Sequence, residues 1–129
     1  MLEGFRALYN QADIVTGHYI RKHDLPIING AMIEHRLPPL TEKLTVDTKM
    51  DLMKHYYLSA SQENLCEALG VPAAKVHMSN AKWREANRLT KEGLGLTAER
   101  VIGDIIQHMA LRNILVERGL LTEPRVWRP

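Results

Sequence analysis

Apolar residues recur at steps of three and four along most of the chain, the spacing that lines one face of an α-helix. The first such segment covers residues 2–20 and places on one face Leu2, Phe5, Leu8, Ala12, Val15 and Tyr19. Basic residues at 21 and 22 and then Pro26 predict its end, because cations suit a helix C-terminus and proline disfavours helix before it. The pattern therefore predicts an amphipathic helix over residues 2–20.

Residues 25–40 have a pattern that fits two local structures. Their apolar run is short, and such a run cannot be assigned by its period alone. Asn29-Gly30 is a turn signal, and Pro38-Pro39 ends any regular element. The segment therefore predicts either a short hairpin around Asn29-Gly30 or a loop with one helical turn at residues 31–36.

Two helices are predicted in the middle of the chain from the residues that would cap them. Asp47 has the side chain of an N-cap, so we expect a helix from there to about residue 58. Ser59, followed three residues later by Gln62, is a capping-box pattern. It predicts a second, short helix that ends at Gly70.

Two longer helices are predicted after Gly70, which gives an all-α fold of about five helices. Pro72 suits the first position of a helix that reaches about residue 91, with residues 93–95 as a linker. Thr97 can cap a last helix that runs to residue 118, where Gly119 would close it in a left-handed conformation.

The composition sets the size and the class of the protein. With 129 residues, of which 45% are apolar, the chain suits a single helical domain over residues 1–129, with a short polar tail at 122–129. No apolar run approaches the roughly 20 residues that span a bilayer, so we expect no membrane partner. One cysteine and an N-terminus without a signal-peptide pattern predict a cytoplasmic protein.

The last predicted helix carries more apolar residues than one stripe requires. It can be a central core helix, or it can use one face for the core and another to pair two protomers. For the second case the predicted dimer contacts are Val101, Ile105, Met109 and Leu115.

Residues 62–81 contain small, apolar and glycine residues at set positions around a turn. The positions are filled by Leu65, Cys66, Leu69, Gly70, Val71 and Val76. This arrangement resembles the helix-turn-helix of phage repressors and Cro-type regulators, which implies a second helix that lies in the major groove of DNA. Ser79 departs from the pattern, because the family usually has an apolar anchor there.

A wider segment, residues 53–89, resembles more loosely the helix-turn-helix region of phage Q-type antitermination proteins and of sigma-factor region four. The resemblance rests on Tyr56-Tyr57, on Leu69-Gly70-Val71 and on the long second helix predicted after them. It keeps RNA polymerase as a candidate partner. An accessory protein that binds the polymerase or another host protein, and a DNA-packaging recognition subunit, are the alternative functions.

The local charge favours DNA binding more than the overall net charge of +2 does. Residues 72–91 hold five basic residues and one acid, Glu85, whereas the charged residues of 59–70 are Glu63 and Glu67. Lysine and arginine displace counterions from phosphates, so a positive second helix suits DNA. The alternative is a solvated basic face.

The resemblance and the charge together assign the DNA contacts. Recognition helices use their N-terminal residues for base edges, which here are Ala73, Ala74, Lys75, His77, Met78 and Asn80. The phosphate contacts are Lys82, Arg84 and Arg88. Trp83 could stack on a base of a single strand, but its helical spacing favours core packing.

No catalytic or metal-binding motif is present in the sequence. The six histidines lack the spacing of metal ligands, and the glycines at 93 and 95 lack the Gly-Lys-Ser/Thr that closes a phosphate loop. We therefore expect a protein that is not an enzyme and has no cofactor. The sequence predicts a small transcriptional regulator that binds double-stranded DNA as a homodimer.

Overall fold

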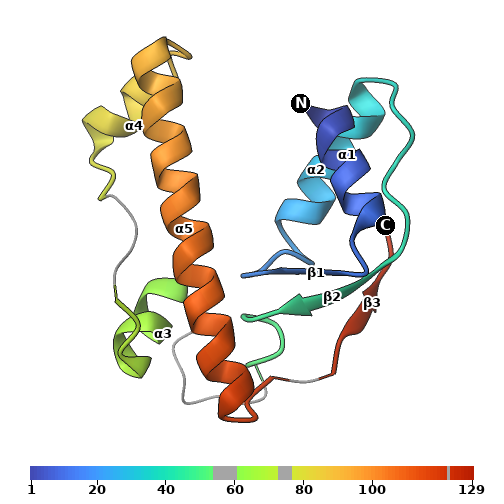
Figure 1. Cartoon of the computed structure of the whole chain (residues 1–129). Coiled ribbons are helices and arrows are strands. Elements are labelled where there is room, and N and C mark those ends of the chain that lie inside the picture. The colour runs from blue at the N-terminus through green and yellow to red at the C-terminus, as the bar shows by residue number, and fades with distance from the viewer. Residues whose placement is uncertain (54–60, 73–76, 122) are drawn as a thin grey trace. The chain divides into compact units, whose positions relative to one another are not determined.

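The computed structural model describes residues 1–53, 61–72, 77–121 and 123–129, and it divides the chain into two compact units. The first unit combines Met1–Ala60 with Arg118–Pro129, and we call it the sheet unit. The second, Ser61–Glu117, is the helical unit. The sequence predicted one helical domain in place of these two units. Figure 1 labels the elements in chain order.

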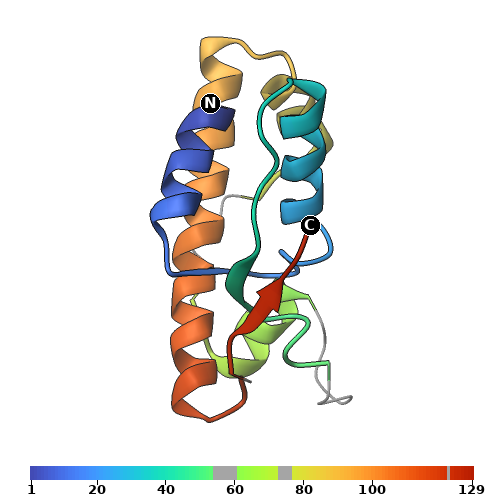
Figure 2. The same ribbon diagram turned by 90° about the vertical axis from the view of Figure 1, so that its right-hand side faces the viewer.

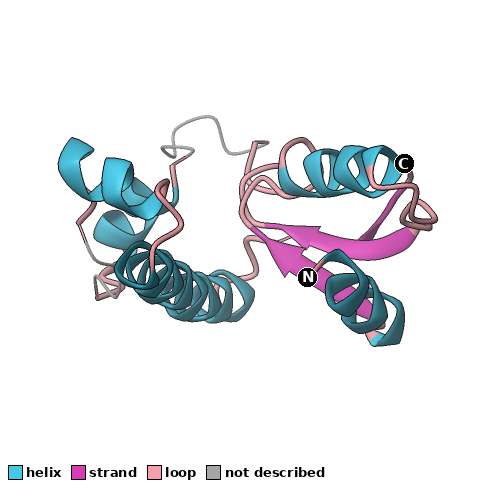
Figure 3. Ribbon diagram, turned by 90° about the horizontal axis from the view of Figure 1, so that it is seen from above, coloured by secondary structure: helices cyan, strands magenta, loops and turns pink. Residues whose placement is uncertain are grey.

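The sheet unit holds a three-stranded mixed sheet, drawn in magenta in Figure 3. Its strands are β1 (Ile14–Gly17), β2 (Lys43–Asp47) and β3 (Arg125–Trp127), in the order β1-β2-β3. β1 and β2 are parallel, whereas β2 and β3 are antiparallel. The prediction of an all-α fold is therefore wrong.

Two helices pack on one face of this sheet, α1 (Leu2–Gln11) and α2 (Asp24–Glu34). Both rise from the same side of the strands in Figures 1 and 2. Their core includes Tyr9, Leu25 and Met32, together with Trp127 from β3. The Tyr9 hydroxyl donates a 2.7 Å hydrogen bond to the carbonyl oxygen of Thr41, and burial raises the pKa of this hydroxyl.

The predicted helix over residues 2–20 is wrong beyond Gln11. Ala12 is extended, with φ −72° and ψ 134°, and the chain continues as β1. Ile14, Val15 and Thr16 are β-branched and therefore favour a strand. The helical period continued through them by coincidence.

Residues 25–40 form neither the predicted hairpin nor a loop with one turn. Most of the first half of this segment is α2, which includes Asn29 and Gly30. Pro26 is tolerated because it lies in the first turn, where a backbone N–H has no partner within the helix. The Asn29 side chain accepts a 2.8 Å hydrogen bond from the backbone nitrogen of Leu40, so it holds the following loop and does not make a turn.

Asp47 ends a strand and does not start the predicted helix. Its carboxylate accepts hydrogen bonds from the backbone nitrogens of Lys49 and Met50, at 3.1 and 3.0 Å, in the turn that follows β2. It also accepts from the backbone nitrogens of Tyr19 and Arg21, at 2.8 and 3.0 Å. Asp47 therefore joins the two parallel strands where both end. Residues 54–58, the rest of that predicted helix, lie outside the described residues.

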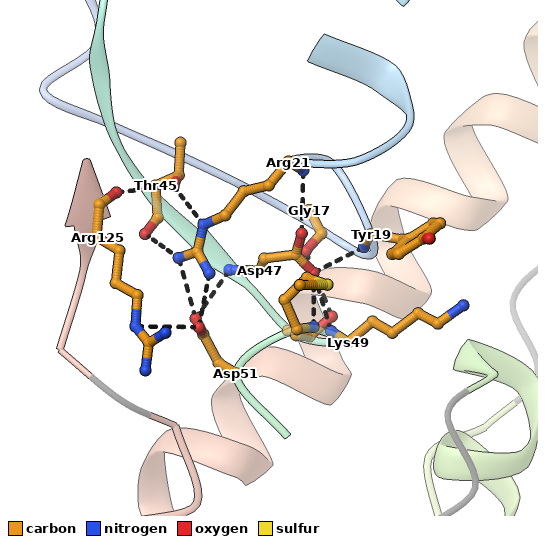
Figure 4. A network of polar contacts seen from close by, with 10 residues as sticks. Gly17, Tyr19, Arg21, Thr45, Asp47, Lys49, Asp51 and Arg125 are labelled. Carbon is orange, nitrogen blue, oxygen red and sulfur yellow. Dashed lines mark hydrogen bonds and ion pairs between the residues drawn. The ribbon is translucent and has the colours of Figure 1, made fainter. Parts of the chain in front are cut away.

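A second buried carboxylate, Asp51, continues this network (Figure 4). The Arg21 guanidinium donates to its two oxygens at 2.7 and 3.2 Å, and also to the side-chain and carbonyl oxygens of Thr45. The Thr45 hydroxyl donates to the carbonyl oxygen of Arg125 at 2.8 Å. The network therefore connects β2 to β3 and to the turn after β1, which gives it a structural role.

The predicted polar tail at 122–129 is wrong as well. Residues 125–127 form β3, and Trp127 is only 7% exposed. Its register places Trp127 opposite Lys43 and Arg125 opposite Thr45. A buried aromatic residue and two arginines that contact acids tie this segment to the sheet unit.

The helical unit consists of α3 (Gln62–Leu69), α4 (Asn80–Ala86) and α5 (Lys91–Glu117). Ser61 is the N-cap of α3, and its hydroxyl accepts a hydrogen bond from the backbone nitrogen of Asn64. Ser59 of the predicted capping box lies outside the described residues. α3 ends at Gly70, as predicted, and Gly70 has the left-handed conformation, with φ 70° and ψ 26°. The positive φ of 64° at Gly119 also confirms its prediction.

α5 begins earlier than predicted and includes the expected glycine linker. Thr90 precedes it and accepts a hydrogen bond from the backbone nitrogen of Gly93 at 3.0 Å. Gly93 is buried, and the backbone carbonyl of Glu85 in α4 lies too close to it to leave room for a Cβ atom. The missing side chain therefore allows α4 to approach α5 closely.

Candidate nucleic-acid interface

α4 is a short helix that begins at a serine cap. Ser79 is extended, with φ −68° and ψ 164°, and its hydroxyl accepts from the backbone nitrogen of Lys82 at 3.3 Å. This explains the departure of Ser79 from the helix-turn-helix pattern, because an N-cap requires a polar side chain and not an apolar anchor.

Of the predicted second helix from residue 72 to about 91, the described part is helical over α4, and a single continuous helix is wrong. His77 and Met78 precede the cap of α4 and lie outside any helix. α4 itself ends at Ala86, and Leu89 has a positive φ of 56°. Asn80 is the first residue of α4 and is exposed. Residues 73–76, which include the predicted base contacts Ala73, Ala74 and Lys75, lie outside the described residues.

The predicted phosphate contacts lie on α4 and just after it. Lys82, Arg84 and Arg88 are all exposed. Lys82 Nζ donates to the carbonyl oxygen of His77 at 3.3 Å, and Arg88 Nη1 lies 3.1 Å from Glu85 Oε2. The other oxygen of Glu85 accepts from the Thr90 hydroxyl at 2.9 Å. The single acid of α4 is therefore already engaged by its neighbours.

A cavity of about 550 Å³ lies beside α4 within the helical unit. Residues of all three helices and of the connection before α4 contribute to its lining: Glu63, Cys66, Glu67, Val71, His77, Met78, Trp83, Arg100 and Gln107. The sequence gives no signal for this cavity, because its lining residues come from three separate segments.

Trp83 differs from its predicted role. Its side chain is 47% exposed and lines the cavity, so the interpretation as a core residue is wrong. The core of the unit is filled by smaller residues instead, among them Leu65, Cys66 and Ala86. An exposed tryptophan beside lysine and arginine is a common feature of surfaces that bind single-stranded nucleic acid.

The predicted dimer contacts divide into two groups on α5. Val101, Ile105 and Met109 are about half-exposed, and they belong to a larger exposed apolar row on this helix. Leu115 is fully buried and lies one turn from the equally buried Leu111. It is therefore a core residue, and its assignment to a dimer contact is wrong.

Comparison with known proteins gives no relative. No family of known proteins matches the chain, and neither a curated protein nor a solved structure is significantly similar to it. Among the described residues, no helix is long and apolar enough to cross a membrane.

Proposed function

We propose that the helical unit binds nucleic acid, with Lys82, Arg84 and Arg88 in contact with phosphates. The carrying observation is that these side chains are all exposed on or next to one short helix, where the one acid is held by Arg88 and Thr90. Exposed cations gathered in this way displace the counterions of a phosphate backbone. The protein then acts by binding, as a small cytoplasmic regulator of transcription that works as a homodimer.

The form of the contact differs from the one that the helix-turn-helix resemblance implies. Phosphate contacts require only exposed cations and position a protein on a nucleic acid, whereas base reading requires a helix aligned in the groove. The described residues between α3 and α4, which are 70–72 and 77–79, are not helical. The proposal therefore rests on phosphate binding by α4 and needs no recognition helix that begins at Pro72.

The test is fluorescence anisotropy with a labelled random-sequence DNA across a salt series. Replacing Lys82 and Arg84 together by alanine should weaken binding and make the slope of log affinity against log salt shallower by about 1 to 2, because each lost phosphate contact removes about 0.7 to 0.9. The matched control is Lys22→Ala with Arg36→Ala, which removes the same charge from exposed sites of the sheet unit.

Equal slopes for the two double variants would contradict the proposal, since binding would then depend only on the total charge. Absence of binding by the unaltered protein at low salt would contradict it as well.

A second candidate function is an accessory protein that binds RNA polymerase or another protein. The exposed apolar row on α5 favours it, because apolar patches of this kind mark surfaces that bind other proteins. Sedimentation of the protein alone would show whether a second copy covers this row. A monomer at high concentration would favour a different protein as the partner.

A further inference from the structure

The cavity beside Trp83 is not explained by phosphate contacts. We propose that it holds one unpaired nucleobase, stacked on the Trp83 indole, while the adjoining phosphates contact the cations of α4. This inference rests on the proposed function and narrows its ligand to a strand with unpaired bases. Four features of the cavity support it: its size, its buried apolar lining residues, the side chain of Trp83, and its charge.

The size of the cavity and its mixed polar and apolar lining suit a nucleobase. Its volume of about 550 Å³ lies within the roughly 300–1,000 Å³ of small-molecule sites. Cys66 and Val71, which are 1% and 6% exposed, contribute apolar surface to it. A base that leaves its stack needs such a surface for its faces and polar groups for its edge.

Trp83 lies on the same short helix as two of the proposed phosphate contacts. Trp83 is half-exposed, and its neighbours along α4 are Lys82 and Arg84. One helix therefore presents both a stacking surface and two cations. Base stacking on an aromatic side chain combined with a basic surface is the usual means of binding single strands.

The charge of the cavity favours a base over a phosphate. Glu63 and Glu67 contribute carboxylates one turn apart on α3. The cation of the lining, Arg100, forms an ion pair with Asp104 at 3.1 Å. Two carboxylates repel a phosphate but accept hydrogen bonds from the exocyclic amino groups of adenine, cytosine and guanine. Thymine has no such group, so we expect the cavity to bind cytosine in preference to thymine.

Three strands of equal length and charge separate the base contact from the phosphate contact. They are oligo-dC, oligo-dT and an abasic strand that keeps every phosphate but has no base. Anisotropy at one salt concentration should give the order dC, dT, abasic, from tightest to weakest. Equal affinity for dC and for the abasic strand would overturn the inference and leave phosphate binding intact.

Trp83→Ala should weaken binding of oligo-dC by about 5- to 150-fold, which corresponds to the loss of one stacked base, and leave the abasic strand unaffected. Trp83→Phe keeps an aromatic face and should retain most of the affinity. An equal loss for dC and the abasic strand in Trp83→Ala would overturn the inference.

The double variant Glu63→Gln with Glu67→Gln tests the contact between the two carboxylates and the amino group of the base. It leaves Trp83 unchanged. We expect this variant to lose the preference for dC over dT. An unchanged preference would contradict the role of the two carboxylates. In contrast, Lys82→Ala with Arg84→Ala should weaken all three strands, so failure of the base pocket and failure of phosphate binding give different results.

Discussion

The two units use charged side chains in opposite ways. In the sheet unit, Asp47 and Asp51 are buried, and their carboxylates accept from backbone nitrogens and from Arg21. In the helical unit, Lys82 and Arg84 are exposed on a short helix. Charges buried with their partners stabilise one arrangement of the chain, whereas exposed charges contribute little to stability and can serve a ligand.

The two tryptophans differ in the same way, since one is buried and the other is exposed. Replacing each by alanine should give the largest difference in stability between the two units. Trp127 is buried in the core of the sheet unit, so Trp127→Ala should lower the free energy of unfolding by about 3–5 kcal/mol. Trp83→Ala removes a half-exposed side chain and should cost much less. Urea denaturation followed by far-UV circular dichroism measures both. Similar losses for the two variants would contradict the assignment of Trp83 to a binding surface.

The hydrogen bonds of the buried Asp47 carboxylate predict the second largest effect on stability. An asparagine at position 47 has nearly the same shape as the aspartate but turns one acceptor oxygen into an NH₂ donor. Because both oxygens of Asp47 accept from backbone nitrogens, Asp47→Asn should lower the stability by about 1–3 kcal/mol. Asp13→Asn makes the same chemical change at an exposed site and is the control. Equal urea midpoints would show that the network does not support the sheet.

Two glycines on α5 should give effects of opposite sign, of which the effect at Gly95 is the smallest of the predicted effects on stability. Gly93→Ala places a methyl group against the backbone carbonyl of Glu85, so it should destabilise the packing of α4 on α5 by about 1–3 kcal/mol. Gly95 has nothing within 4 Å of such a methyl group, so Gly95→Ala should stabilise the helix by up to about 1 kcal/mol. Thermal unfolding should therefore shift in opposite directions, and a shared direction would contradict the close approach.

The sequence predicts local features of this fold better than long-range ones. The left-handed glycines at 70 and 119 follow from their own conformational freedom, and most of α5 follows from its apolar period. The sheet was missed because its strands span only three to five residues each, too short to show a period of two. Their pairing also joins distant segments, such as Ile14 with Leu44 and Leu44 with Val126.

The candidate site could also be predicted from the sequence only in its local features. The cluster of basic residues can be recognised from sequence because its members are close together along the chain. The cavity cannot, because Glu63, Trp83 and Arg100 are brought together only by the packing of α3 and α4 against α5. The prediction of one long recognition helix is wrong at Ser79, which caps the start of α4. In the sequence, this serine is a departure from the helix-turn-helix pattern, and that pattern does not indicate an N-cap.

The sheet unit is split in sequence by the helical unit, and this has a consequence for synthesis on the ribosome. β3 is translated after the whole helical unit, although its partner β2 is made long before. Since domains generally fold as units in the order in which they emerge, the helical unit can fold while the sheet still lacks β3 and Trp127. The nascent sheet therefore has an open edge at β2 until residues 125–127 leave the exit tunnel.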